Sequence, residues 1–315
     1  MKHRQLSLQL LVFILLFSLA VPASATPATE SNTIQLESFN EYDYIELLQT
    51  SSPQELEEIG ISEQEAMTVI SEFEDALLDR ASLSDSELES YGYDDSEIAL
   101  FHALTDGETL SSAEIRSLGS TCEGEITRHS FTETSAKFSY TFTWDRCPIM
   151  TLSDSAAMRW IAYDSTDEDI GVEPASSSMR VEYHFKGNAS SDGSPAFAHY
   201  GNPTSEPNLD FNTMNMQFPV YEPHTSDNGI IFDCYAKTGT VTVTVKLPKG
   251  SATTLHHIFV GGLYGHTLVG VGSPSVSVNE GSIAISFTGN TSTDPIASQK
   301  ATIYKATTEV EYWKD

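Results

Sequence analysis

The sequence predicts an α+β protein with two segregated parts, a small all-α N-terminal module followed by an all-β antiparallel sandwich domain. Apolar residues recur at helical spacing in the first part, whereas from Thr121 onward they alternate every second residue. Composition changes at the same point. Residues 26–119 carry four Gly and no Cys or Trp, whereas residues 120–315 carry fifteen Gly, all three Cys and all three Trp. We therefore divide the chain into residues 1–25, 26–119 and 120–315.

Residues 1–25 have the pattern of a secretory signal peptide. Lys2 and Arg4 form a basic start, Leu6–Val21 is an apolar run, and Ala23-Ser24-Ala25 is a small-residue cleavage site. The run is shorter than the roughly 20 residues that a membrane-spanning helix needs. We therefore favour cleavage after Ala25 over a membrane anchor. No second long apolar run follows, so we expect a secreted, extracellular mature chain with no membrane span.

Residues 26–119 are predicted to form helix-turn-helix hairpins that repeat at an offset of 32 residues. The stretch 53–65 aligns with 85–97, and a half copy follows at 112–119. In each copy a short helix is expected to end at Gly60 or Gly92, because glycine adopts the left-handed cap conformation at little cost. The second helix of each copy then opens on a capping box. These boxes are Ser62 with Glu65, and Asp94 with Glu97.

The excess of acidic residues argues against partners that are themselves negatively charged. The chain has 45 acidic and 16 basic side chains, for a net charge of −29. This excess argues against binding to nucleic acid or to an anionic membrane surface, both of which need basic residues. Residues 26–119 hold 23 acidic and two basic side chains, a net charge of −21, so the excess belongs chiefly to the helical module. A cationic partner, if the protein has one, should dock there.

From Thr121 onward the alternation predicts antiparallel strands with one buried face and one solvated face. Two sheets packed face to face would cover all of the apolar faces, which favours a β-sandwich, with a closed barrel as the alternative. Residues 188–212 contain three prolines and are predicted to form a large loop. The clearest alternating segments are 138–145, 179–186, 214–220, 240–247 and 282–288.

Secretion changes the interpretation of the three cysteines, because an oxidising compartment permits disulfides. Cys122 and Cys147 flank one strand-rich stretch and are the first candidates for a disulfide, which leaves Cys234 over. The alternative is that all three are buried thiols that act as small apolar side chains.

Residues 164–169 place four carboxylates within six residues after a predicted strand. Calcium prefers oxygen ligands from flexible backbone, so Asp164, Asp167 and Asp169 are a candidate calcium site. The spacing does not match an EF-hand loop, and the competing interpretation is a solvated turn. Calcium is the one cofactor that the sequence suggests.

No catalytic motif is present, so we name no catalytic residue. His256, His257 and His266 could join a site only if the fold gathers them. The Gly-rich stretch 261–272, with the alternating segments around it, is compatible with a pore-forming or toxin-like β protein. Carboxylates of the β part could serve an extracellular hydrolase. The acidic residues considered for that role are Asp145, Glu173, Glu182, Asp210, Glu222 and Asp233.

The chain resembles secreted proteins of Gram-positive bacteria. The resemblance rests on the signal peptide, the acidic Glu-Leu-x-x-x-Gly repeats, and the stretches 237–243 and 264–267. It implies export but assigns no activity and no functional residue. We therefore expect a non-catalytic extracellular binding or cell-envelope interaction protein, whose partner is an extracellular protein or a cell-wall component. The hydrolase and the pore-forming protein are the alternatives.

Overall fold

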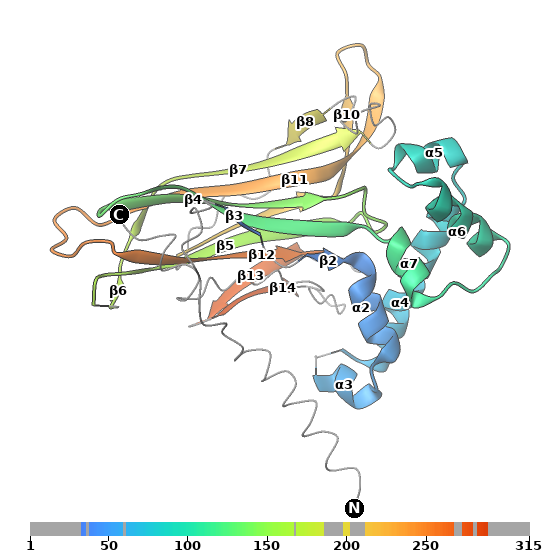
Figure 1. Ribbon diagram of the computed structural model, residues 1–315, viewed down its shortest axis with the longest axis horizontal. Coiled ribbons are helices and arrows are strands. Elements are labelled where there is room, and N and C mark those ends of the chain that lie inside the picture. The colour runs from blue at the N-terminus through green and yellow to red at the C-terminus, as the bar shows by residue number, and fades with distance from the viewer. Residues whose placement is uncertain are drawn as a thin grey trace, which may run out of the picture.

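The computed structural model describes residues 33–35, 38–58, 61–166, 168–185, 198–201, 212–267, 273–279 and 282–288. Helices occupy residues 41–118 and antiparallel sheets follow over residues 121–265, so the prediction of an α+β protein with segregated parts is confirmed at this level. Figure 1 shows the helices gathered at one end of the long strands.

The helices begin where the sequence places their caps. Ser62 and Asp94 cap α4 and α6, and both capping boxes are formed. Gly92 has a φ of +94°, the left-handed conformation that was expected at the end of α5, whereas Gly60 lies outside the described residues. No described helix combines the length and the apolar character of a membrane span. The helices are α2 (Glu41–Thr50), α3 (Pro53–Glu58), α4 (Glu63–Ala81), α5 (Asp85–Ser90), α6 (Asp95–Thr105) and α7 (Ser112–Leu118).

The larger sheet has the strand order β1-β3-β4-β11-β7-β8, with β2 paired to β3 and β10 paired to β11. The described strand pairings of this sheet are antiparallel. Its strands are β1 (Thr33–Gln35), β2 (Phe39–Asn40), β3 (Thr121–Phe131), β4 (Ser135–Trp144), β7 (Glu173–Phe185), β8 (Ala198–Gly201), β10 (Tyr221–Thr225) and β11 (Ile231–Lys246).

The second sheet is centred on β5, which pairs with β12 and with both β6 and β9. A third pair, β13 and β14, forms a separate two-stranded sheet. These strands are β5 (Ser153–Tyr163), β6 (Asp169–Ile170), β9 (Thr213–Pro219), β12 (His257–Gly265), β13 (Ser273–Asn279) and β14 (Ser282–Thr288).

One apolar core joins the first two sheets. Phe142 of β4 stacks on Phe218 of β9, with ring centroids 5.1 Å apart. Gly262 of β12 lies so close to the ring of Tyr140 in β4 that a Cβ atom would overlap it. Residues from strands of both sheets, such as β4, β11, β5 and β12, therefore share this apolar core.

The helical and β parts interlock instead of meeting at a flat boundary. Strands β1 and β2 precede the helices in sequence, yet they pair with β3. Phe39 of β2 belongs to the core between the sheets. In return, Ile149 and Met150, from the connection between β4 and β5, belong to the core of the helical module. Each part thus completes the core of the other.

Candidate functional site

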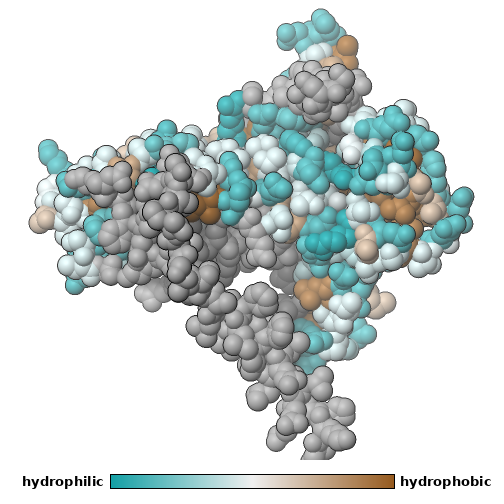
Figure 2. Space-filling model, in the orientation of Figure 1, coloured by the Kyte–Doolittle hydropathy of each residue, from teal (hydrophilic) through white to brown (hydrophobic). Residues whose placement is uncertain are grey.

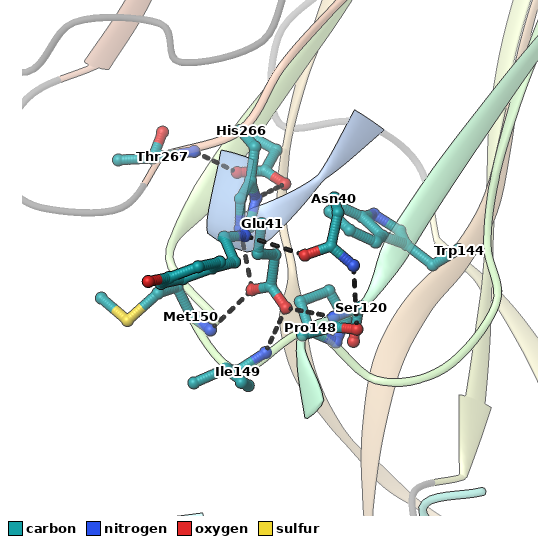
Figure 3. A network of polar contacts seen from close by, with 12 residues as sticks. Asn40, Glu41, Ser120, Trp144, Pro148, Ile149, Met150, His266 and Thr267 are labelled. Carbon is teal, nitrogen blue, oxygen red and sulfur yellow. Dashed lines mark hydrogen bonds and ion pairs between the residues drawn. The ribbon is translucent and has the colours of Figure 1, made fainter. Parts of the chain in front are cut away.

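Glu41, the first residue of α2, is fully buried where the helices meet the sheets. Asn40 caps this helix, and its side chain also donates to the backbone oxygen of Gly119, which fixes the helix start beside β3. Figure 3 shows the Glu41 carboxylate among backbone N–H groups and the ring of His266. The N–H groups that donate to it belong to Ser120 at 2.9 Å, Ile149 at 3.0 Å and Met150 at 3.0 Å.

His266 links Glu41 to a second buried carboxylate, that of Asp154 in β5. Its Nδ1 lies 2.8 Å from Asp154 Oδ2, and its Nε2 lies 3.2 Å from Glu41 Oε1. Asp154 also accepts hydrogen bonds from the hydroxyl of Tyr264 at 2.5 Å and from the backbone N–H of Thr267 at 2.9 Å. We call Glu41, Asp154, Tyr264, His266 and Thr267 the junction network.

Electrostatics favour a charged His266 between two carboxylates. Burial opposes its charge, but Asp154 and then Glu41 outweigh burial and raise the pKa of His266 to about 10. Burial likewise opposes ionisation of Glu41, but the hydrogen bond and charge of His266, with backbone N–H groups, hold the pKa of Glu41 below its ordinary value. At neutral pH His266 is therefore an imidazolium whose two N–H groups donate to the two carboxylates.

Arg80 of α4 makes a second set of buried contacts across the same boundary. Its guanidinium donates to the backbone oxygens of Cys147 at 3.3 Å and Pro148 at 2.8 Å, and to the hydroxyl of Tyr93 at 3.1 Å. It also lies over the ring of Tyr91, 4.5 Å from the centroid. Arg80 thus binds backbone carbonyl groups of the connection between β4 and β5, and Glu41 binds backbone N–H groups of the same connection.

The junction network can fasten the two parts, but it cannot meet a substrate in this conformation. The side chains of Glu41 and His266 are 0% exposed, and so is that of Asp154. Both ring nitrogens of His266 are occupied by carboxylate oxygens. A carboxylate–imidazole pair catalyses proton transfer only when a reacting group comes within hydrogen-bonding reach. The arrangement therefore acts as a structural joint between the helical module and the sheets.

The candidate calcium residues lie at the turn between β5 and β6. Asp164 Oδ1 accepts hydrogen bonds from the backbone N–H of Thr166 at 2.8 Å, from its hydroxyl at 2.7 Å, and from the N–H of Glu168 at 3.2 Å. Asp169 is exposed at the start of β6, and Asp167 lies outside the described residues. Within the described ranges no group of three His, Cys, Asp or Glu is placed to hold a metal ion. The calcium site stays a prediction.

Cys122, Cys147 and Cys234 are all buried, and none is in a disulfide in the structure. Cys122 lies in β3 opposite Trp144, whereas Cys147 lies in the connection that Arg80 holds. Burial, with the nearby carboxylate of Asp154, raises the pKa of Cys122 well above its ordinary value. The pairing of Cys122 with Cys147 in an oxidising compartment stays a prediction.

The carboxylates considered for hydrolysis are dispersed over several strands of the fold. Glu182, Glu222 and Asp233 lie on β7, β10 and β11, which are neighbours. Glu182 pairs with His184 at 2.6 Å, and Asp233 accepts a hydrogen bond from the Tyr221 hydroxyl at 2.6 Å. Asp145 caps the start of β3 by accepting from the Thr121 N–H, Glu173 opens β7, and Asp210 lies outside the described residues.

The sequence singles out His266 as a candidate but neither of its partners, Glu41 and Asp154. Glu41 was one of 23 acidic residues in the helical module, and its burial has no local signature. A weak signal existed in the capping box that Asn40 forms with Asp43, which starts a helix at Glu41. Asp154 directly precedes the buried run of β5, an unusual place for an unpaired charge.

Comparison of the chain with protein-family models, with curated proteins and with solved structures found no match in any of the three. The interpretation of the site therefore depends on its own geometry.

Proposed function

We propose that the protein is a secreted, non-catalytic binding protein that acts outside the cell, on an extracellular protein or a cell-wall component of positive charge. The observation that supports this proposal is the rigid attachment of a strongly acidic module to a β part. Residues 41–118, which include helices α2–α7, carry 21 acidic and two basic side chains. Of the two basic ones, Arg80 is buried and Arg116 is paired with Asp43. The outer surface of the helices is therefore almost purely anionic.

Attachment matters because a binding surface loses less entropy when its elements are held in place. Glu41 and Arg80 hold α2 and α4 against the connection between β4 and β5, where they contact four consecutive residues, 147–150. Figure 2 shows hydrophilic residues over much of the visible face of the helices. A cationic partner would meet a preformed field of carboxylates, which speeds association and makes it sensitive to salt.

The β part would serve as the scaffold of this module. We propose that its two sheets form a sandwich, the closure that the sequence pattern favours, because their buried faces share one core. Secretion itself is inferred from the signal-peptide pattern of residues 1–25.

The test is binding of the purified protein, immobilised, to cell-wall fragments, polysaccharides and culture proteins at low and high salt. We expect capture that fades as added salt shortens the screening length from about 10 Å at 0.1 M to about 3 Å at 1 M. A variant that neutralises four exposed carboxylates of α4 should lose most of this capture. Its substitutions are Glu72→Gln, Glu74→Gln, Asp75→Asn and Asp79→Asn, all at exposed positions.

A matched control neutralises four exposed carboxylates of the β part and should retain capture. Its substitutions are Glu123→Gln, Glu133→Gln, Glu168→Gln and Glu173→Gln. An untargeted hydrolase screen runs beside the binding experiment. Turnover that a single Asp or Glu substitution abolishes would replace the binding proposal with the hydrolase, and equal capture by both variants would remove the helical module from the interaction.

A further inference from the structure

Helix α4 presents large apolar side chains on its exposed side as well as on its buried side. With 19 residues it is the longest of the described helices. Its buried side packs into the core of the helical module through Val69, Phe73 and Leu77. Met67 and Leu78 lie outside that core and are 59% and 47% exposed. Burial of these two side chains against a partner would lower the free energy of the complex.

Single exposed apolar residues are normal on a protein surface, so the position of these two relative to each other is what matters. Leu78 follows Met67 by 11 residues in one unbroken helix. At about 100° and 1.5 Å per residue, this separation makes three turns plus about 20°, and about 16 Å along the axis. The two side chains therefore lie on one line of the helix surface, which we call the α4 stripe. Ile70, one turn after Met67 and partly buried, connects this stripe with the core.

Carboxylates lie on the α4 stripe and directly beside it. Glu74 lies on the stripe itself, between Met67 and Leu78. Asp75 and Asp79 lie about 60–100° further round the helix from Leu78. All three carboxylates belong to exposed residues. The exposed side of α4 therefore combines a row of apolar side chains with an adjacent row of negative charges.

The helical module has no Lys or Arg to spare for these carboxylates. Residues 41–118 contain two such residues, Arg80 and Arg116. Arg80 is buried on the other side of α4, in contact with the connection between β4 and β5. Arg116 pairs with Asp43 of α2. Positive charges that match the carboxylates beside the α4 stripe therefore have to come from outside this module.

We propose that the α4 stripe binds an amphipathic cationic helix of the extracellular partner. This inference rests on the proposed function and specifies the partner that the acidic module accepts. Apolar residues of the partner helix would cover Met67 and Leu78 over about three turns, and its Lys or Arg residues would lie over Asp75 and Asp79. A cationic polymer without apolar groups would match the carboxylates equally well but would leave the α4 stripe in water. The apolar contact therefore selects among cationic partners.

The experiment compares two synthetic peptides of Leu and Lys that have the same composition and the same length as α4. In the patterned peptide the leucines recur at helical spacing on one face, and in the shuffled peptide no face is apolar. Binding of each peptide to the purified full chain is measured by isothermal titration calorimetry at low and high salt. We expect the patterned peptide to bind at least about tenfold more tightly than the shuffled one. Circular dichroism should show that the patterned peptide gains helicity on binding.

Substitutions in the protein locate the apolar contact. Met67→Gln combined with Leu78→Gln removes the apolar surface of the stripe and preserves the helix, because Gln is nearly as good a helix former as Met and Leu. Affinity for the patterned peptide should fall about tenfold, and affinity for the shuffled peptide should stay within about twofold. The matched control is Ile230→Thr combined with Ile231→Thr, which removes two exposed apolar side chains where β10 turns into β11. It should leave both affinities unchanged.

Urea unfolding midpoints of both variants are measured beside binding, to show that each is folded. Equal affinity for the two peptides, with loss of both at high salt, would overturn the amphipathic-helix inference and leave the proposed cationic partner intact. Failure of both peptides to bind would also overturn the inference, while capture of cell-wall and culture components decides the proposed function separately. An equal loss of affinity in the Ile230 and Ile231 control would place the apolar contact away from α4 and overturn the inference as well.

Discussion

Substitution of Glu41 by glutamine is the sharpest test of the junction network. Each carboxylate oxygen serves two donors: Oε1 receives Met150 and His266, and Oε2 receives Ser120 and Ile149. An amide keeps one oxygen and replaces the other with an N–H₂ group, so two of the four hydrogen bonds are lost whichever way it turns. The N–H₂ group of the glutamine would also point at two N–H groups, and none of these three groups can accept a hydrogen bond.

The expected loss in the free energy of unfolding follows from these hydrogen bonds. Hydrogen bonds to charged groups contribute about 1.5–3 kcal/mol each, so two of them correspond to about 3–6 kcal/mol. This range agrees with the roughly 3–5 kcal/mol that removal of one partner of a buried ion pair costs. At about 2–4 °C per kcal/mol for a domain of 150–250 residues, the Tm of Glu41→Gln should fall by roughly 10 °C.

The assay is urea unfolding followed by tryptophan fluorescence and by far-ultraviolet circular dichroism. Because the network joins both parts, the two signals should shift together to lower urea. Glu57→Gln, at an exposed position of α3, is the matched control and should change stability by no more than about 0.5 kcal/mol. A loss below about 1 kcal/mol in Glu41→Gln, or a shift in the helical signal alone, would refute the reasoning.

Three other predictions follow from the same structure. The pKa of His266 rises from 6.5 to about 10 on folding, so the stability that protonated His266 contributes to the fold is complete below pH 6.5 and is lost as the pH rises toward 10. The pKa of Glu41 is lowered on folding, so ionised Glu41 contributes stability above pH 4.5 that is lost on acidification. Urea unfolding midpoints measured across pH test both effects. In His266→Gln the midpoint should no longer fall as the pH rises toward 10. Gly262→Ala forces a methyl group into the Tyr140 ring and should cost about 1–3 kcal/mol, measured by the same unfolding. Arg80→Met leaves two buried carbonyls without their donor and should cost about 2–5 kcal/mol by calorimetry, whereas a change below 1 kcal/mol would contradict the assigned contacts.

The helices and strands could be predicted from the sequence because their determinants are local. Ser62 and Asp94 start helices through capping boxes that span three residues, and Gly92 ends one through its own backbone freedom. The alternation of Phe138, Tyr140 and Phe142 depends only on the geometry of an extended chain. Such signals specify which elements form and which face of each is apolar.

Only the tertiary structure decided which residues meet at the junction. Asp154 and His266 are separated by 112 residues, and Glu41 and His266 by 225. Their contact depends on the order and register of strands in two sheets, which local periodicity does not encode. Burial also reverses the role of these side chains. Glu41 in water would be one more solvated carboxylate of an acidic module, whereas in the fold its charge is matched by His266 and three backbone N–H groups, and it fastens the helices to the sheets.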